Sequence, residues 1–274
     1  MFGGASFFAL TDALGKWLTA SLPVIQLGWL RCITGVLLIG LFMLVTGNLH
    51  TLKTTRPGWH LFRAVIGTLT VILNIYCLGQ IPLAEFTAII FSQPFFIAIL
   101  SAIILKERIS KQSWAAIIIG FIGILFVARP SPDHFHIAHV VALFTSLLFA
   151  IMSVTARYLS NSESVFALNF YVYPLNIILS FYWATSSWVA PSLNEWYLIV
   201  AMGIAATVAF GCVMQAMRYA RAAVVAPVDY TRLIWVGVLG YYFWYELPDL
   251  YTCIGVLFIL GSGMFILKQI RHSH

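Results

Sequence analysis

The chain has 274 residues, of which 61% are hydrophobic and only 9% are charged. A soluble domain carries about 25% charged residues, so this composition excludes a soluble protein and indicates an integral membrane protein. The net charge of +6 does not indicate a nucleic-acid partner, because the basic residues lie between apolar segments and form no continuous stripe.

Ten stretches are apolar enough to cross a bilayer as helices, each of which requires about 20 mainly apolar residues. In chain order they cover 2–20, 24–46, 60–80, 82–105, 112–129, 138–158, 165–186, 195–217, 222–245 and 249–268. Most connections between them are short, which leaves no room for a water-soluble domain. We therefore expect an all-α integral membrane protein with ten transmembrane helices.

The basic residues predict the orientation of these spans. With ten spans, both termini lie on one side of the membrane. The basic residues on that side are Lys53, Arg56, Arg63, Lys106, Arg108, Lys111, Arg157, Arg218, Arg221, Lys268 and Arg271. The other side has Arg129, with Lys16 near the end of the first span. Since cytoplasmic loops carry the excess of Lys and Arg, we place both termini in the cytoplasm.

The two halves of the sequence resemble each other. The segment FALTDALGKWL (8–18) matches FAIMSVTARYL (149–159), and LKERISKQSW matches WYELPDLYTC at nearly the same offset. We therefore expect two five-helix repeats, 1–130 and 131–274. Because five is an odd number, the second repeat is inverted in the membrane relative to the first. Inverted repeats are typical of secondary transporters that alternate access around a central site.

At several positions the sequence resembles the EamA-type transporters of the drug/metabolite transporter (DMT) superfamily. The matching residues, which extend over nearly the whole chain, are Arg31, Pro94, Glu107, Gly123, Glu246 and Gly255. Ser262 stands where the family pattern has glycine. The resemblance implies a proton- or exchange-driven carrier of small organic metabolites in a bacterial inner membrane. The segments TLKTTRPGWHLFRAVIG and APVDYTRLIWVGVLGYYFWYELPD resemble S-adenosylmethionine uptake carriers most, although riboflavin, amino-acid and drug carriers share much of the pattern.

The ninth span contains two charged residues in the segment VVAPVDYTRLIW (224–235). Asp229 and Arg232 are three residues apart and therefore lie on one helix face. Charged side chains inside a bilayer face the bundle interior or a wet cavity. Pro227 frees backbone carbonyl groups just before them. We interpret Asp229, Tyr230, Arg232 and Pro227 as a substrate site, with an ion pair that only stabilises the bundle as the alternative.

The first, second and fourth spans also contain charged residues. We expect Lys16 to extend its ammonium group to the outer surface. Asp12, one turn deeper, is a candidate for binding substrate or carrying a proton. Arg31 needs an acidic partner, either Asp12 or Asp229, and has either an architectural role or a substrate contact. Glu85 opens the fourth span near the outer face, where it is either solvated or a proton acceptor.

Further polar and aromatic side chains within the spans are candidates for the substrate path, although each is also consistent with ordinary packing. They are Asn74, Gln93, Asn169, Tyr171 and Trp235. Aromatic rings among them could hold a flat or cationic ligand.

The segment PDHFHIAH brings His134, His136 and His139 together, and three histidines can bind zinc. Because this segment joins two predicted spans on the outer side, we expect a solvated loop and no metal.

The main alternative from another class is an integral-membrane enzyme. The chain has only nine acidic residues and no glycine-rich phosphate loop, and no two intramembrane acids lie close in sequence. We therefore expect no enzymatic activity and no cofactor. The expected partners are a small-molecule metabolite, the lipid bilayer, and protons or a counter-substrate, and we expect the protein to act as a monomer.

Overall fold

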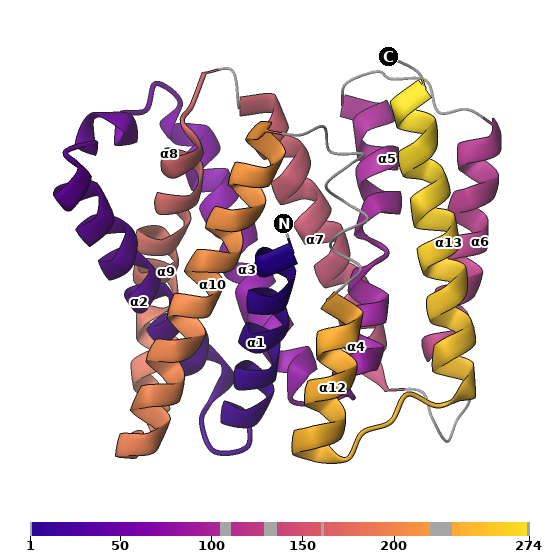
Figure 1. Ribbon diagram of the computed structural model, residues 1–274. Helices are drawn as coiled ribbons and strands as arrows, with labels where there is room; N and C mark the ends of the chain where they lie inside the picture. The colour runs from indigo at the N-terminus through magenta and orange to yellow at the C-terminus, as the bar shows by residue number, and fades with distance from the viewer. Residues whose placement is uncertain (1, 105–110, 129–135, 160–161, 220–231, 273–274) are drawn as a thin grey trace.

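The computed structural model describes residues 2–104, 111–128, 136–159, 162–219 and 232–272, and every regular element in these ranges is a helix. Figure 1 shows them as an upright bundle. The elements are α1 (Phe2–Leu18), α2 (Val24–Thr46), the 3-10 helix η1 (Leu49–Leu52), α3 (Pro57–Leu78), α4 (Leu83–Ile90), α5 (Gln93–Ile104), α6 (Lys111–Ala128), α7 (Ile137–Leu159), α8 (Val165–Phe170), α9 (Val172–Ser186), α10 (Leu193–Tyr219), α12 (Arg232–Trp244) and α13 (Leu250–His272). The predicted all-α architecture is confirmed.

Among the residues that the structure describes, two predicted spans are interrupted rather than continuous. The fourth is divided between α4 and α5, and the seventh between α8 and α9. Pro94 is the second residue of α5 and Pro174 the third residue of α9. Proline has no backbone N–H to donate to the preceding turn, so each span breaks just before its proline.

The composition of the helices fits a lipid environment. By length and composition, the helices that can cross a membrane are α2, α3, α7 and Leu193–Cys212 of α10, and shorter apolar helices lie at Trp114–Val127 and Leu250–Phe265. Large apolar side chains such as Leu41, Ile178 and Leu257 are exposed on the outer faces of the bundle. In water such surfaces would aggregate, whereas lipid tails are as apolar as leucine. The protein is a multi-pass membrane protein.

The packing brings helices from distant parts of the chain together. Helix α1 packs against α10 and α12, α3 against α7 and α9, and α6 along α13. We call the end of the bundle with loops 47–56 and 162–164 the upper end, as drawn in Figure 1. The lower end carries the connections 19–23, 79–82, 187–192 and 245–249. The basic-residue pattern predicts that the upper end is cytoplasmic.

The contact between α6 and α13 depends on two glycines. A Cβ atom added at Gly123 would lie 2.7 Å from the carbonyl oxygen of Gly255. A Cβ atom added at Gly255 would lie 2.5 Å from the carbonyl oxygen of Gly123. Small residues allow membrane helices to approach this closely. Both glycines belong to the pattern on which the family resemblance rests, and the structure gives them a shared packing role.

We predict that Gly123→Ala and Gly255→Ala each lower the free energy of unfolding by about 1–3 kcal/mol, because the added methyl group meets backbone that cannot rotate away. The control is Gly261→Ala on the same helix, where an added Cβ meets nothing within 4 Å. Thermal unfolding of the three purified variants in detergent provides the comparison. A loss in Gly261→Ala as large as that in Gly255→Ala would contradict the prediction.

Candidate functional site

A buried ion pair joins α1 to α12. Arg232, the first residue of α12, donates a hydrogen bond from Nη2 to Asp12 Oδ2. Both side chains are buried. The Arg232 guanidinium carbon also lies 5.2 Å from the centre of the Phe8 ring, a cation–π contact. The pair therefore fixes two helices that are far apart in sequence.

A second guanidinium group lies close to the same carboxylate. Arg31 on α2 is buried and interacts electrostatically with Asp12. Taking about 1.5 Å per residue, Asp12 lies about 9 Å from the end of α1 and Arg31 about 10 Å from the start of α2, so they share one depth. Within the described residues, the buried Nε atoms of Arg31 and Arg232 have no hydrogen-bond partner. The cluster of Asp12, Arg31 and Arg232, here called the charged cluster, can therefore accept a further anionic group.

Aromatic side chains surround this cluster. Tyr173 on α9 is buried, hydrogen-bonds with Thr207 on α10 and interacts electrostatically with Arg31. Its ring lies 3.1 Å from the position that a Cβ of Gly35 would take, so a side chain on α2 at this point would displace it. Phe8 packs edge-to-face with Phe210 at 5.0 Å between ring centres. The charged cluster is thus bordered by rings from α1, α9 and α10.

The structure brings Asp12, Arg31 and Arg232 together. From the sequence, Asp12 was one of two possible partners of Arg31, but the contact between Asp12 and Arg232 was not predicted. Asp229, Tyr230 and Pro227 lie outside the described residues and stay predictions. Trp235 lies one turn beyond Arg232 and is 38% exposed.

The other predicted path residues do not join the charged cluster in any contact that the structure describes. Gln93 donates from Nε2 to Ser153 Oγ at 3.0 Å, which ties the break between α4 and α5 to α7. Asn74 is buried on α3, and Asn169 is half-buried on α8. Tyr171 donates its hydroxyl hydrogen to the Leu52 carbonyl at 2.8 Å and so belongs to the upper end.

The lower end is held by an ion pair. Lys16 Nζ lies 2.5 Å from Glu246 Oε1 and 3.2 Å from the Ile81 carbonyl oxygen, and it lies over the Trp244 ring. Glu246 Oε2 accepts a hydrogen bond from the Leu83 N–H at 3.1 Å. The expectation that Lys16 extends into the outer water is wrong, because its side chain is only 11% exposed and its charge is paired. This ion pair lies one turn below Asp12 and joins α1 to the connection between α12 and α13.

A second polar pair lies at the lower end. Glu85 in the first turn of α4 contacts His139 in the first turn of α7, with 3.1 Å between Oε2 and Nε2. The expectation of a solvated histidine loop is wrong for His139, which is buried, while His136 is exposed and His134 lies outside the described residues. Glu85 is the acid that brings His139 inward.

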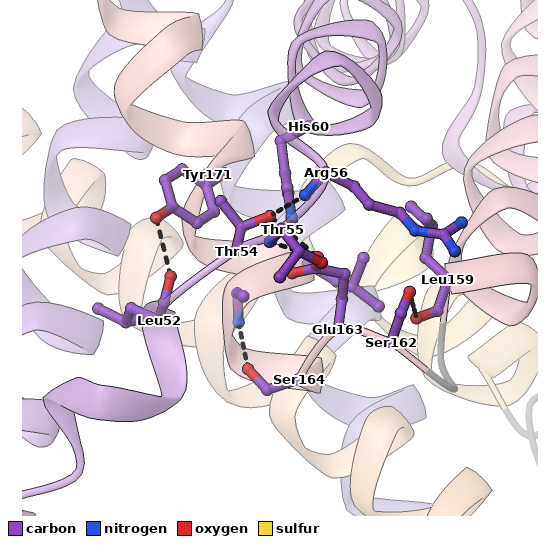
Figure 2. A network of polar contacts seen from close by, with 12 residues as sticks. Leu52, Thr54, Thr55, Arg56, His60, Leu159, Ser162, Glu163, Ser164 and Tyr171 are labelled. Carbon is purple, nitrogen blue, oxygen red and sulfur yellow. Dashed lines mark hydrogen bonds and ion pairs between the residues drawn. The ribbon is translucent and has the colours of Figure 1, made fainter.

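The upper end has a third polar network, shown in Figure 2. Glu163 Oε1 accepts hydrogen bonds from Thr54 Oγ1 at 3.0 Å and from the N–H and hydroxyl of Thr55 at 3.1 and 3.3 Å. Its Oε2 lies 3.2 Å from His60 Nε2, and the His60 ring packs on Tyr171. The network ties loop 52–56 to the connection between α7 and α8.

The surroundings of Glu163 set its charge. Burial opposes ionisation, but the hydrogen bonds from His60, Thr55 and Thr54 favour the carboxylate more strongly and hold the pKa of Glu163 below its usual range. A carboxyl group whose pKa is lower in the folded state stabilises the fold at pH values above its unfolded pKa, which is about 4.3 for Glu. This stabilisation is lost as the pH falls through the folded-state pKa.

We predict that Glu163→Gln lowers the free energy of unfolding at neutral pH by about 1–3 kcal/mol, because buried donors lose a charged acceptor. The wild-type protein should also lose stability on acidification below about pH 4, and the variant should lack this part of the loss. Thermal unfolding in detergent across a pH series measures both effects. Parallel pH profiles for the two proteins would refute the assignment.

Sequence reasoning missed several of these residues. Arg63, which was counted among the basic residues of the cytoplasmic side, is buried and donates to the Met152 carbonyl at 2.6 Å and to Thr155 Oγ1 at 2.7 Å. Glu163 had one usable signal, since it is one of only nine acids in the chain. Glu246 was selected by the family resemblance, but its ion pair with Lys16 was not expected. Their partners are distant in sequence, and no local pattern identifies them.

These features define a multi-pass membrane protein with paired charges inside its helical bundle. Residues 1–129 and 136–268 each match the EamA-like transporter family. The chain belongs to this family, within the DMT superfamily. It is therefore a membrane transporter of small metabolites and not an enzyme.

Curated relatives cover most of the chain. The S-adenosylmethionine uptake transporter of Rickettsia bellii is 26% identical over 256 residues, which span 93% of this chain and 88% of the relative. The pseudopaline exporter CntI of Pseudomonas aeruginosa is 30% identical over 261 residues, with 93% and 90% covered. The riboflavin transporter of Vibrio cholerae is 24% identical over 267 residues, with 94% and 88% covered.

A solved crystal structure has the same fold. It superposes with a TM-score of 0.70 over 100% of this chain and 97% of that chain, at 18% sequence identity.

Proposed function

We propose that this transporter is a secondary active carrier of a bacterial inner membrane that moves its metabolite by alternating access. S-adenosylmethionine uptake is the specific assignment. It is supported by the sequence resemblance and by a relative named for this activity that spans most of the chain. The carrier acts as a monomer in the bilayer.

The charged cluster is the observation that carries the assignment. Asp12 is an anchor for a cationic group, and Arg31 and Arg232 have buried N–H groups that suit a carboxylate. S-adenosylmethionine has both groups, as an amino acid with a sulfonium centre. Arginine binds carboxylates well because its guanidinium group presents a planar array of donors. The neighbouring rings of Phe8 and Phe210 favour a ligand with a flat or cationic part.

The proposed mechanism uses two inverted repeats, 1–130 and 131–274. Two matches to one family model support this division. The helix contacts support it as well, because they occur in exchanged pairs. Helix α1 packs on α10 as α7 packs on α3, and α1 packs on α12 as α7 packs on α5. In alternating access, the Lys16–Glu246 pair at the lower end and the Glu163 network at the upper end open in turn.

Export is the second candidate direction. It is favoured by the 30% identity to a protein named as an exporter. Riboflavin, amino acids and drugs are the alternative substrates within the same fold.

We predict that proteoliposomes containing the wild-type carrier exchange radiolabelled S-adenosylmethionine for unlabelled S-adenosylmethionine. Asp12→Asn and Arg232→Gln should each raise the substrate concentration at half-saturation by about tenfold to a hundredfold, because each removes a charged hydrogen bond to the substrate. The double variant should not regain the exchange that the single variants lose. Arg56→Gln changes an exposed cation at the upper end and should leave exchange unchanged.

Restored exchange in the double variant would assign the Asp12–Arg232 pair to architecture alone. Exchange of riboflavin and not of S-adenosylmethionine would change the assigned substrate to riboflavin. Gradient-driven flux measured in both directions separates uptake from export.

We predict that both termini are cytoplasmic. In a background without native cysteines, Thr55→Cys at the upper end should be protected in intact cells from a membrane-impermeant thiol reagent. Ala190→Cys at the lower end should react. Both positions are exposed, so accessibility is set by the side of the membrane. The reverse labelling pattern would invert the orientation.

A further inference from the structure

The contact between Glu85 and His139 has the geometry of a proton-binding site. The Glu85 carboxyl group is 24% exposed, whereas the His139 ring is only 5% exposed. The two groups lie at the lower end, in the first turns of α4 and α7. Glu85 thus connects a buried titratable ring with that end of the bundle.

The second ring nitrogen of His139 has both a donor and an acceptor within reach. Its Nδ1 lies 3.2 Å from the backbone nitrogen of His136 and 3.0 Å from the backbone oxygen of the same residue. A neutral ring accepts from the His136 N–H, as the third residue of a helix does in a capping box. A protonated ring donates to the His136 carbonyl instead. The His139 ring can therefore gain a proton without leaving a buried nitrogen unpaired.

The proton balance follows from these contacts. Before the additional proton binds, the Nε2–H group of His139 donates to the Glu85 carboxylate, and the pair carries one negative charge. One added proton binds Nδ1 and makes an imidazolium ion, so the pair becomes neutral. The first turns of two helices surround Glu85, and helix N-termini stabilise a carboxylate.

Other titratable groups pack around this pair. Helix α4 contacts α1, α3, α6, α7, α12 and α13, and α7 also contacts α3 and α5. At the lower end, the titratable residues described on or directly beside these helices are Lys16, Tyr76, Cys77, His136, Tyr241, Tyr242, Tyr245, Glu246, Asp249, Tyr251 and Cys253. Lys16 and Glu246 are paired with each other, and Glu246 also holds the N–H of Leu83, two residues before Glu85. A change in charge of the Glu85–His139 pair therefore occurs beside the turn of α4 that the lower-end ion pair holds.

Asp12, the other predicted proton carrier, has a different partner. Arginine cannot be deprotonated in a protein, so the Asp12–Arg232 pair has a single titratable member. Histidine changes charge near physiological pH. We propose that Glu85 and His139 together bind the proton that drives transport. This inference rests on the proposed function as a secondary active carrier.

The first experiment tests proton binding without any substrate. The carrier is labelled with ¹⁵N-histidine in lipid nanodiscs, and His139→Gln identifies the ring signals. Between about pH 8 and about pH 5, Nδ1 of His139 should change from an unprotonated acceptor to a protonated donor, while Nε2 stays protonated. Glu85→Gln should shift this transition. Glu195 is an acid at the same end that hydrogen-bonds with Ser21 and Ser192, and Glu195→Gln should not shift the transition. An Nδ1 atom that keeps one state throughout this range overturns the proposal.

The second experiment tests coupling. In proteoliposomes with a pH gradient, Glu85→Gln and His139→Gln should each accumulate at least about tenfold less radiolabelled S-adenosylmethionine than the wild-type carrier. A tenfold lower concentration ratio corresponds to roughly 1.4 kcal/mol less driving force. Both variants should keep exchange at equal pH, as should His50→Gln at the exposed upper end. Normal gradient-driven accumulation in either variant overturns the proposal. If the wild-type carrier exchanges no S-adenosylmethionine, the substrate assignment fails, and the ring titration alone decides the proton site.

Discussion

The rest of the structure depends on the need to pair every charge that lies inside an apolar bundle. A lone charge at the centre of a bilayer is unfavourable by at least about 2.5–3.5 kcal/mol on insertion scales. Each ion pair within the described residues joins the first half of the chain to the second. These pairs are Asp12–Arg232, Lys16–Glu246, His60–Glu163 and Glu85–His139. Electrostatic contacts therefore join the two halves at both ends of the bundle and at mid-depth.

This arrangement suits the proposed alternating-access mechanism, in which the two halves move relative to each other. Hydrophobic contacts between helices in lipid contribute little to specificity, because contacts with lipid tails can replace them at little loss of free energy. An ion pair with hydrogen bonds fixes one geometry and is lost when the partners separate. Pairs at both ends of the bundle and at mid-depth thus select discrete conformations of the two halves.

The positions of the helices could be predicted from sequence because hydropathy is a local signal. The span predicted at 24–46 is α2 itself, and the span predicted at 138–158 differs from α7 by one residue at each end. The breaks before α5 and α9 were not predicted, although Pro94 and Pro174 are visible in the sequence. A proline inside a membrane helix can be accommodated by neighbouring groups, so its presence does not determine a break.

The candidate site was predictable only in part. Asp12, Arg31 and Arg232 could be selected because charges are rare in the spans, but their mutual contact depends on how α1, α2 and α12 pack. The same limit explains the errors for Lys16 and His139. Each was assigned to solvent because its acidic partner, Glu246 or Glu85, lies in a segment distant in sequence.

The backbone contact between α6 and α13 restricts how the protein can evolve. In most packed interfaces, a larger side chain on one helix is accommodated when the opposing residue becomes smaller. Gly123 and Gly255 already have no side chain, and each faces the other's carbonyl oxygen. Neither position can compensate for a change in the other. Variation at this crossing must be absorbed by surrounding side chains, such as Val127 beside Gly255 and Ile259 beside Gly123, or by displacement of a whole helix.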